Sequence, residues 1–324
     1  MKSLFSLSFL LSIMAIQNSF ADPIEKFFPD AFKENSGIKV HPKNIIGIEG
    51  YVIEEFSENE KNRNHWDNRG EDPIQFLVMH YTVCDFPVTL RLFTANVDSG
   101  RVSAHYVLTQ QDETFKVSGG IPIQVVPEDR RAWHAGVSSW RGVKNLNATS
   151  IGIENINPGF IGDELVQPKW FPFDPVQITS LGLLSSDIVR RYKIQPQNVI
   201  GHADIAPTRK QDPGILFPWK ELYVKYGVGA WLLEEERRPS FISTQYLPKE
   251  PLPQGISEAF FINSLRKYGY DCPENAYITP EHHGVVKAFK SHFSHNQHPE
   301  AYNPSIDEAA MLWAWGLGAK YQQK

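Results

Sequence analysis

The sequence predicts an α/β domain, in which helices cover a central sheet, followed by a small all-α module of three helices. Short apolar runs that end at polar residues alternate with helical patterns from about residue 74 to residue 202. Proline then becomes frequent between Pro239 and Gly255, and only helical patterns follow.

The length and charge of the chain limit the classes of protein to which it can belong. Its 324 residues are enough for two domains of roughly 100–200 residues each. The 32 Lys and Arg residues against 37 Asp and Glu residues give a formal net charge of -5. Proteins that bind nucleic acid carry a basic patch or stripe, and this sequence has none. We therefore expect a globular protein that does not bind nucleic acid.

Residues 1–21 have the pattern of a cleavable signal peptide. Lys2 precedes an apolar run from Leu4 to Ile16, and Ser19 and Ala21 place small residues at the −3 and −1 positions. A membrane anchor is the alternative, but this run is shorter than the ~20 residues that span a bilayer. We expect an exported protein, with the periplasm as its destination and no membrane span in the mature chain.

The first expected strand is "IQFLVMHYT" (74–82), which is apolar and β-branched in its first half and carries His80 near its end. The segment 88–95 has helical spacing. "SAHYVLTQ" (103–110) and "TFKVSG" (114–119) predict the two arms of a hairpin.

The second half of the α/β domain repeats this alternation. "SIGIENIN" (150–157) predicts a strand. Asp174 and Pro175 then form a helix start, an N-cap residue followed by proline, and an apolar stripe runs from Ile178 to Tyr192. "NVIGH" predicts a last short strand that ends at His202.

Residues 241–255 are interpreted as a proline-rich linker. The helical patterns that follow cover about 256–268, 280–293 and 305–321, with Trp313 and Trp315 expected in the core. The two cysteines, Cys84 and Cys272, are interpreted as free thiols, although an exported protein could also pair them.

Two side chains in "GHADIAPTRKQDPG" (201–214) raise the question of a metal. His202 and Asp212 are ligand types that zinc prefers, and His80 is the best third candidate because it also ends a buried strand. His105 and His134 are weaker candidates, since neither has an acidic neighbour in the sequence. Any one of these histidines, taken alone, is more often structural than metal-binding.

Five histidines near the C-terminus form a second group. Their helical spacing can suit a metal, but we interpret them as a solvated polar helix face. They are His282, His283, His292, His295 and His298.

Several strings occur together in an order that resembles the type-2 N-acetylmuramoyl-L-alanine amidase family, within the peptidoglycan-recognition-protein superfamily. They are "MHYT" (79–82), "SAHYVL" (103–108), "AWHAG" (132–136), "SIGIEN" (150–155), and "GHADIAPTRKQDPG" (201–214) with "FPW" (217–219). The sequence departs from the usual pattern at Asn155 and Thr208. The resemblance implies a mixed central sheet flanked by helices.

The resemblance also implies a zinc site and its chemistry. The implied zinc ligands are His80, His202 and Asp212, and the implied catalytic residues are Glu154 and Lys210. The alternation in "SIGIEN" keeps Glu154 off the face that holds the isoleucines, and the prolines beside Lys210 stiffen its loop. Three further residues are expected to line the substrate cleft: Tyr81, Trp133 and His134.

These residues imply a zinc amidase that cleaves the amide between the lactyl group of N-acetylmuramic acid and L-alanine, acting as a monomer on peptidoglycan or muropeptides. The alternatives are a non-catalytic peptidoglycan-recognition protein and an amidase that recycles anhydro-muropeptides. The amidase domain is expected over residues 22–240. Residues 256–324 resemble the helical peptidoglycan-binding domains of wall hydrolases.

Overall fold

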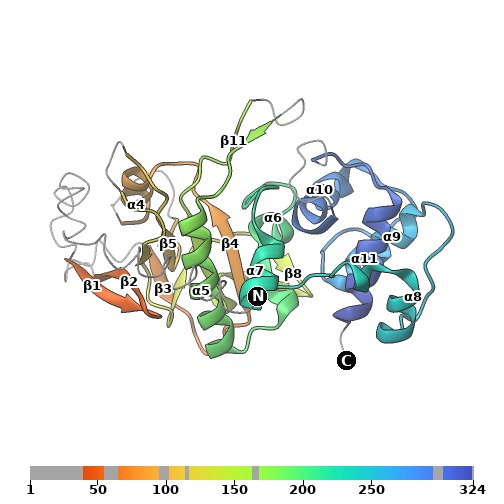
Figure 1. Ribbon diagram of the computed structural model, residues 1–324, viewed down its shortest axis with the longest axis horizontal. Helices are drawn as coiled ribbons and strands as arrows, with labels where there is room; N and C mark the ends of the chain where they lie inside the picture. The colour runs from red at the N-terminus through yellow and green to blue at the C-terminus, as the bar shows by residue number, and fades with distance from the viewer. Residues whose placement is uncertain are drawn as a thin grey trace, which may run out of the picture.

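The computed structural model describes residues 39–54, 65–94, 102–113, 117–162, 168–294 and 302–322 (Figure 1). The expected signal peptide lies outside these residues. Among the helices of these ranges, none combines the length and the apolar character needed to cross a membrane.

A seven-stranded mixed sheet forms the centre of the first part of the chain, which confirms the predicted fold class. Its strands β4, β10 and β13 are parallel to one another, whereas β5 pairs antiparallel with β6, and β1 with β2. In spatial order the strands are β1 (Lys39–Ile45), β2 (Ile48–Glu54), β6 (Pro122–Gln124), β5 (Tyr106–Leu108), β10 (Ser150–Asn155), β4 (Phe76–Tyr81) and β13 (Val199–Gly201).

Helices cover both faces of this sheet. Helix α5 (Pro175–Tyr192) begins where predicted, because the Asp174 side chain accepts a hydrogen bond from the Val176 N–H at 2.9 Å. It packs with α7 (Trp219–Tyr226) on the face that holds Tyr106 and Leu108. Helix α4 (Phe86–Thr94) packs on the opposite face with Val107, as the alternation along a strand requires.

The predicted hairpin is wrong in its second arm. Strand β5 pairs with Pro122–Gln124, and the expected arm at 114–119 contributes, in its described part, one isolated bridge between Asp112 and Val117. The chain turns at Gly120, whose φ of +77° suits glycine, and passes against the start of α5. Because of this turn, the strand that pairs with β5 begins several residues later in the sequence than predicted.

Small elements complete the first part. They are β3 (Trp66–Asn68), β7 (Arg130–Ala132), β8 (Ser139–Trp140), β9 (Val143–Lys144), η2 (Leu146–Thr149), β11 (Phe160–Ile161), β12 (Lys169–Trp170), η3 (Pro196–Asn198) and α6 (His202–Ile205). Cys84 and Cys272 are both free, as predicted.

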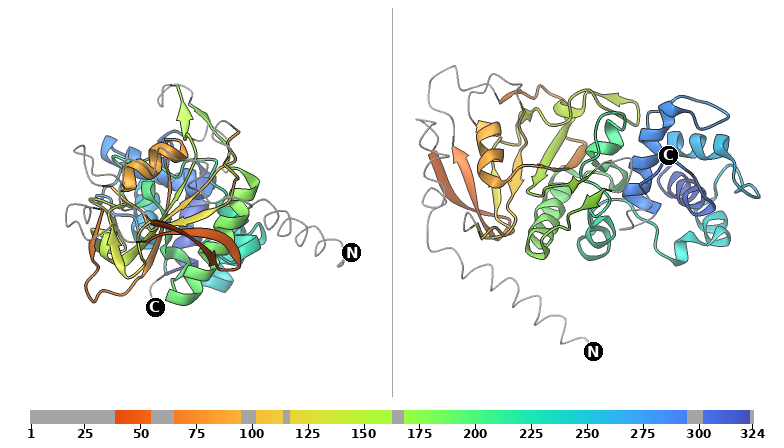
Figure 2. Two further views of the ribbon diagram at one scale, coloured as in Figure 1. Left: turned by 90° about the vertical axis from the view of Figure 1, so that its left-hand side faces the viewer. Right: turned by 90° about the horizontal axis from the view of Figure 1, so that it is seen from above.

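The C-terminal helices lie beyond the β13 edge of the sheet, at the end of the molecule opposite β1 and β2 (Figures 1 and 2). Their buried side chains belong to the same apolar cluster as those of the sheet, and Trp313 and Trp315 are buried as predicted. The elements are α9 (Glu258–Tyr268), η6 (Pro280–His282), α10 (His283–Phe289), η7 (Lys290–Ser294) and α11 (Glu308–Lys320).

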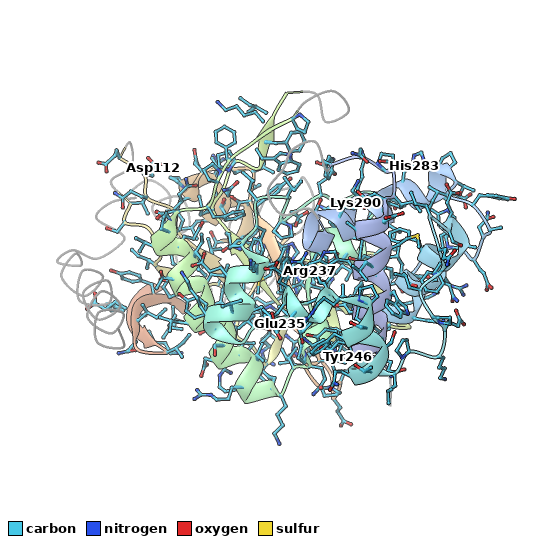
Figure 3. The ribbon with its side chains drawn as sticks, turned by 45° about the vertical axis from the view of Figure 1, so that its right-hand side comes forward. Asp112, Glu235, Arg237, Tyr246, His283 and Lys290 are labelled. Carbon is cyan, nitrogen blue, oxygen red and sulfur yellow. The ribbon has the colours of Figure 1, made fainter. Side chains whose placement is uncertain are left out.

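The segment that joins the two parts is partly helical, with η4 (Glu235–Arg237), α8 (Pro239–Phe241) and η5 (Ile242–Tyr246). Figure 3 shows Arg237 and Tyr246 beside the C-terminal helices, and the Arg237 guanidinium lies 5.4 Å from the centroid of the Trp313 ring. The buried Ile242 packs in a cluster with Trp315. The start of this segment is therefore attached to the C-terminal helices.

The predicted solvated histidine face is wrong for two of its members. His282 is buried, its Nδ1 accepts a hydrogen bond from the Thr279 N–H, and its Nε2 donates one to the Pro273 carbonyl. His292 is buried against Trp219 and bonds to Asp204. His295 and His298 lie outside the described residues. His282 lies inward because it bonds to residues that shortly precede it, and His292 because it packs on Trp219 and Asp204. Helical spacing alone reveals neither set of contacts.

Candidate functional site

His80 and His202 come together because their strands are neighbours. Strands β4 and β13 are parallel, with Gly201 opposite Met79, so their carboxyl ends meet at one edge of the sheet. His80 is the fifth residue of β4, and His202 follows β13 directly. The expectation that these two strand ends converge is confirmed.

Asp212 returns to the same place through a tight loop. The Ala203 N–H donates to the Asp212 carbonyl at 2.8 Å, which ties the loop to the residue after His202. The Asp212–Pro213 peptide bond is cis. A Cβ added to Gly201 would lie 2.7 Å from Pro213 Cδ, so glycine allows the two segments to touch. The stiff loop thus holds His202 and Asp212 side by side.

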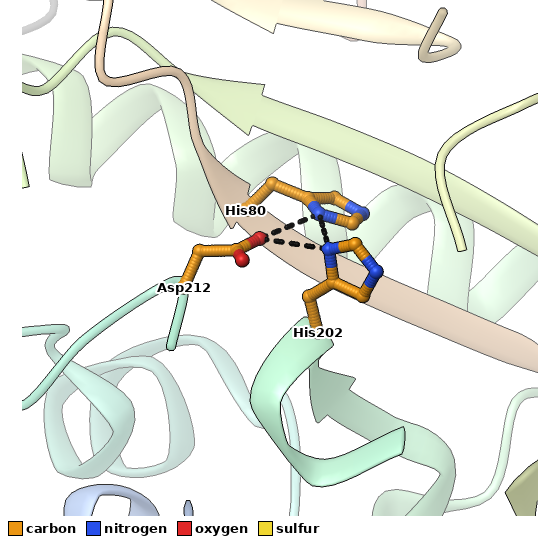
Figure 4. A group of neighbouring side chains, drawn as sticks. All are labelled: His80, His202 and Asp212. Carbon is orange, nitrogen blue, oxygen red and sulfur yellow. Dashed lines mark hydrogen bonds and ion pairs between the residues drawn. The ribbon is translucent and has the colours of Figure 1, made fainter. Parts of the chain in front are cut away.

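His80, His202 and Asp212, here called the His-His-Asp cluster, direct three donor atoms at one point (Figure 4). His80 Nδ1 lies 3.1 Å from His202 Nδ1 and 2.8 Å from Asp212 Oδ2, and His202 Nδ1 lies 3.1 Å from the same oxygen. Tetrahedral zinc ligands at about 2.0–2.2 Å from the metal are about 3.4 Å apart. The donor set and its spacing, slightly compact, fit a zinc ion with one open position.

The second nitrogen of each imidazole has a partner that fits this use of Nδ1. His202 Nε2 lies 3.2 Å from the Ala135 carbonyl, to which it can donate. His80 Nε2 lies 3.0 Å from His134 Nδ1, and His134 Nε2 lies 3.1 Å from Ser150 Oγ. Such partners fix the tautomer and the orientation of metal-binding histidines.

The His80 imidazole is held in the form that a metal needs. Burial, opposed by its bond to Asp212, lowers the pKa of His80 to about 4, so its ring is neutral at pH 7. The imidazoles of His202 and His80 outweigh the effect of burial and hold the pKa of Asp212 far below its ordinary value. The cluster therefore offers two imidazoles and a carboxylate.

Glu154 stands beside the cluster on the same face of the sheet. It is directly opposite His80 in the parallel pairing of β10 with β4, so both side chains point to one side. Its Oε2 is buried and has no hydrogen-bond partner among the described residues. Burial and the nearby Asp212 charge, opposed by Lys210, raise the pKa of Glu154 to about 8. A carboxyl group of this kind can exchange a proton near neutral pH.

A cavity of about 520 Å³ opens over these residues. All of the sequence-predicted site residues except His80 line it: Tyr81, Trp133, His134, Glu154, His202, Lys210 and Asp212. His80 lies immediately below, with 1% of its surface exposed. The structure thus brings every predicted site residue to one cleft.

His134 has a position that the sequence did not predict. It was expected as a cleft residue and, less strongly, as a metal ligand, but its ring lies between His80 and Ser150 within hydrogen-bond distance of both. A Cβ added to Gly152 would lie 2.6 Å from this ring, which explains the glycine in "SIGIEN". Asn155, an unusual residue at its position, donates to the His80 carbonyl at 2.9 Å. The local sequence indicates neither the contact of His134 with His80 nor that of Asn155 with His80.

Comparisons with known proteins agree with this geometry. Residues 70–215 match the family described as N-acetylmuramoyl-L-alanine amidase. The N-acetylmuramoyl-L-alanine amidase AmiD of Escherichia coli strain K12 is 40% identical over 252 residues, which are 77% of this chain and 84% of AmiD. The 1,6-anhydro-N-acetylmuramyl-L-alanine amidase AmpD of the same strain is 35% identical over 177 residues, 49% of this chain and 87% of AmpD.

Solved structures give the same result over most of the chain. AmiD of E. coli, in complex with anhydro-N-acetylmuramic acid-L-Ala-D-γ-Glu-L-Lys, has a TM-score of 0.62 and 38% identity, covering 79% of this chain and 93% of its own. AmpDh3 of Pseudomonas aeruginosa has a TM-score of 0.63 and 34% identity, covering 76% and 92%.

The fold, the cleft and these matches define a hydrolase that cleaves amide bonds in peptidoglycan. The chain belongs to the N-acetylmuramoyl-L-alanine amidase family. The predicted family and the predicted amidase activity are both confirmed.

Proposed function

We propose that His80, His202 and Asp212 of the His-His-Asp cluster would hold one Zn²⁺, and that Glu154 and Lys210 beside them promote hydrolysis of the amide between the lactyl group of N-acetylmuramic acid and L-alanine. The observation that carries the proposal is the convergence of His80 Nδ1, His202 Nδ1 and Asp212 Oδ2 within 3.1 Å of one another. Zinc held there would acidify a bound water and polarise the scissile carbonyl.

Glu154 is the proposed proton carrier. The raised pKa of its buried carboxyl allows it to accept a proton from the attacking water and to deliver it to the departing alanine nitrogen. An amide nitrogen leaves poorly unless it is protonated, so this second transfer matters as much as the first. The position of Glu154 opposite His80 keeps both transfers at the cluster.

Lys210 is the proposed stabiliser of the developing oxyanion. It lines the same cleft two residues before Asp212, on a loop held by hydrogen bonds from the Arg209 and Lys210 N–H groups to the Ala206 carbonyl at 3.0 and 3.1 Å. A cation already fixed in place need not reorganise during the reaction. Tyr81 and Trp133 are proposed as walls for the substrate, while His134 orients His80.

The substrates proposed are peptidoglycan and its muropeptides. The filled ligand set and Glu154 argue against a protein that binds without cutting. A preference for small anhydro-muropeptides is the second candidate, favoured by the anhydro substrate in the AmiD complex and by the similarity to AmpD.

We also propose export to the periplasm, on the charged and apolar pattern of residues 1–21, and action as a monomer, since one chain supplies the whole cleft. The amidase domain is proposed to span residues 22–240, with a linker at 241–255 and the helical domain at 256–324.

Mass analysis of the products tests the proposed function. The chain is incubated with purified sacculi and, separately, with soluble anhydro-muropeptides, with and without a zinc chelator. Free stem peptides that begin with L-alanine, lost on chelation and restored by Zn²⁺, are expected from at least one substrate. Comparing the two rates decides between wall and muropeptide as substrate. Activity that survives complete zinc removal would contradict the proposal.

A further inference from the structure

A buried carboxylate next to the candidate metal centre is held by the C-terminal helices. Asp204 lies on α6, two residues after His202, with 2% of its surface exposed. Its Oδ2 accepts from the Gly201 N–H at 2.7 Å and from His292 Nδ1 at 2.7 Å, and its Oδ1 accepts from the Tyr270 hydroxyl at 2.5 Å. Two of these three donors belong to the C-terminal part of the chain.

The residues that reach Asp204 are firmly placed. The Arg141 N–H, between β8 and β9, donates to the Gly269 carbonyl at 2.9 Å, and the Arg141 side chain donates to the Tyr268 carbonyl. The Tyr270 and Trp140 rings form a T-shaped contact with centroids 4.8 Å apart. The turn that follows α9 is thus docked on the β8–β9 hairpin.

The second donor, His292, is equally constrained. Its ring is stacked on Trp219 at 3.7 Å between centroids with an interplanar angle of 18°. Nearby, a Cβ added to Gly284 would collide with the Pro207 carbonyl, so α10 lies directly against the loop between His202 and Asp212. The C-terminal helices therefore contact the metal-binding segment from two directions.

The geometry points to a positioning role: we propose that Tyr270 and His292, acting through Asp204, hold the segment 201–212 in its metal-binding conformation. Asp204 caps Gly201, the residue before His202, and the next N–H, that of Ala203, binds the Asp212 carbonyl. Fixing the Asp204 carboxylate therefore fixes the backbone of both ligands. The proposal rests on the proposed zinc site.

If either donor is lost, the segment 201–212 is less ordered in the absence of zinc. Part of its ordering must then occur when zinc binds, and the affinity for zinc falls. Removing a direct partner of a metal ligand typically costs about 10–100-fold in metal affinity. Asp204 acts one step further from the ligands, so a loss of about threefold to tenfold is expected for either donor.

The test compares two tyrosines of the same turn in the full-length chain. Tyr270→Phe removes the hydroxyl that binds Asp204. Tyr268→Phe is the matched control, because Tyr268 is also buried, while its hydroxyl has no partner among the described residues. His292→Phe, which keeps a ring against Trp219, is the second variant should Tyr270→Phe fold poorly. Zinc dissociation constants are measured by competition with a chelator of known affinity.

Tyr270→Phe and His292→Phe should bind zinc threefold to tenfold more weakly than the wild type, and Tyr268→Phe within twofold of it. Equal affinities for Tyr270→Phe, Tyr268→Phe and the wild type would overturn the positioning role. Asp212→Ala distinguishes a failure of the proposed zinc site from a failure of the positioning role. If Asp212→Ala still binds zinc fully, the proposed zinc site fails. If it loses zinc while the Tyr270 variant does not, only the positioning role fails.

Discussion

The Glu154 carboxyl should make the folded protein less stable as the pH rises, and Glu154→Gln should abolish this effect. In the zinc-free protein the pKa of Glu154 is raised by burial from 4.5 to about 8. The pKa of Glu154 is higher in the folded state than in the unfolded state. Its favourable contribution to the free energy of unfolding is therefore complete below pH 4.5 and is lost as the pH rises through about 8.

The magnitude follows from the size of this pKa difference. At about 1.36 kcal/mol per pKa unit, the full difference corresponds to roughly 5 kcal/mol, of which about 4 kcal/mol falls between pH 5 and pH 9. Glu154 is partly exposed on the cleft wall, so solvent screening makes this an upper limit.

The assay is urea unfolding with a chelator present, at several pH values between 5 and 9. The free energy of unfolding of Glu154→Gln, relative to wild type, should rise from pH 5 to about pH 8 and then level off. Glu71→Gln, a change at an exposed carboxylate, controls for the general effect of replacing glutamate with glutamine. Parallel pH curves for the wild type and Glu154→Gln would refute the reasoning. With zinc bound, the variant should keep its metal and lose about 10²–10⁴-fold in turnover.

Three other variants test the remaining roles. Asp212→Ala should lower both the zinc content per chain and the turnover, measured by elemental analysis and product release; full zinc occupancy with normal turnover would refute this ligand assignment. Lys210→Met should keep zinc and lower kcat by about 10²–10³-fold, and an unchanged kcat would exclude an oxyanion role. His134→Phe removes the partner of His80 Nε2, so zinc affinity should fall about 10–100-fold; an unchanged dissociation constant would leave His134 as a cleft wall only.

The elements that could be predicted from the sequence have strong local signals. The helix after Asp174 has its N-cap, its proline and its apolar stripe within one segment. His80 and His202 each end an apolar strand, and two parallel neighbours necessarily bring such ends together. The local pattern therefore indicated that His80 and His202 could meet, and the family resemblance implied that they do, together with Asp212.

The features that could not be predicted depend on what packs against them. The arm that pairs with β5 begins only after the chain has turned at Gly120 against α5. His292 occupies a helical position that would be solvated if Asp204 and Trp219 did not lie opposite it. His134 similarly contacts His80 because Gly152 has no side chain in the space that the His134 ring occupies. None of these partners is close in sequence.

The most direct test of the proposed zinc site is anomalous diffraction at the zinc absorption edge, measured from crystals of the active full-length enzyme. The account predicts one strong peak per chain, about 2.0–2.2 Å from Nδ1 of His80, Nδ1 of His202 and Oδ2 of Asp212. A zinc peak bound by other side chains, or an active enzyme with no peak between these three atoms, would contradict it.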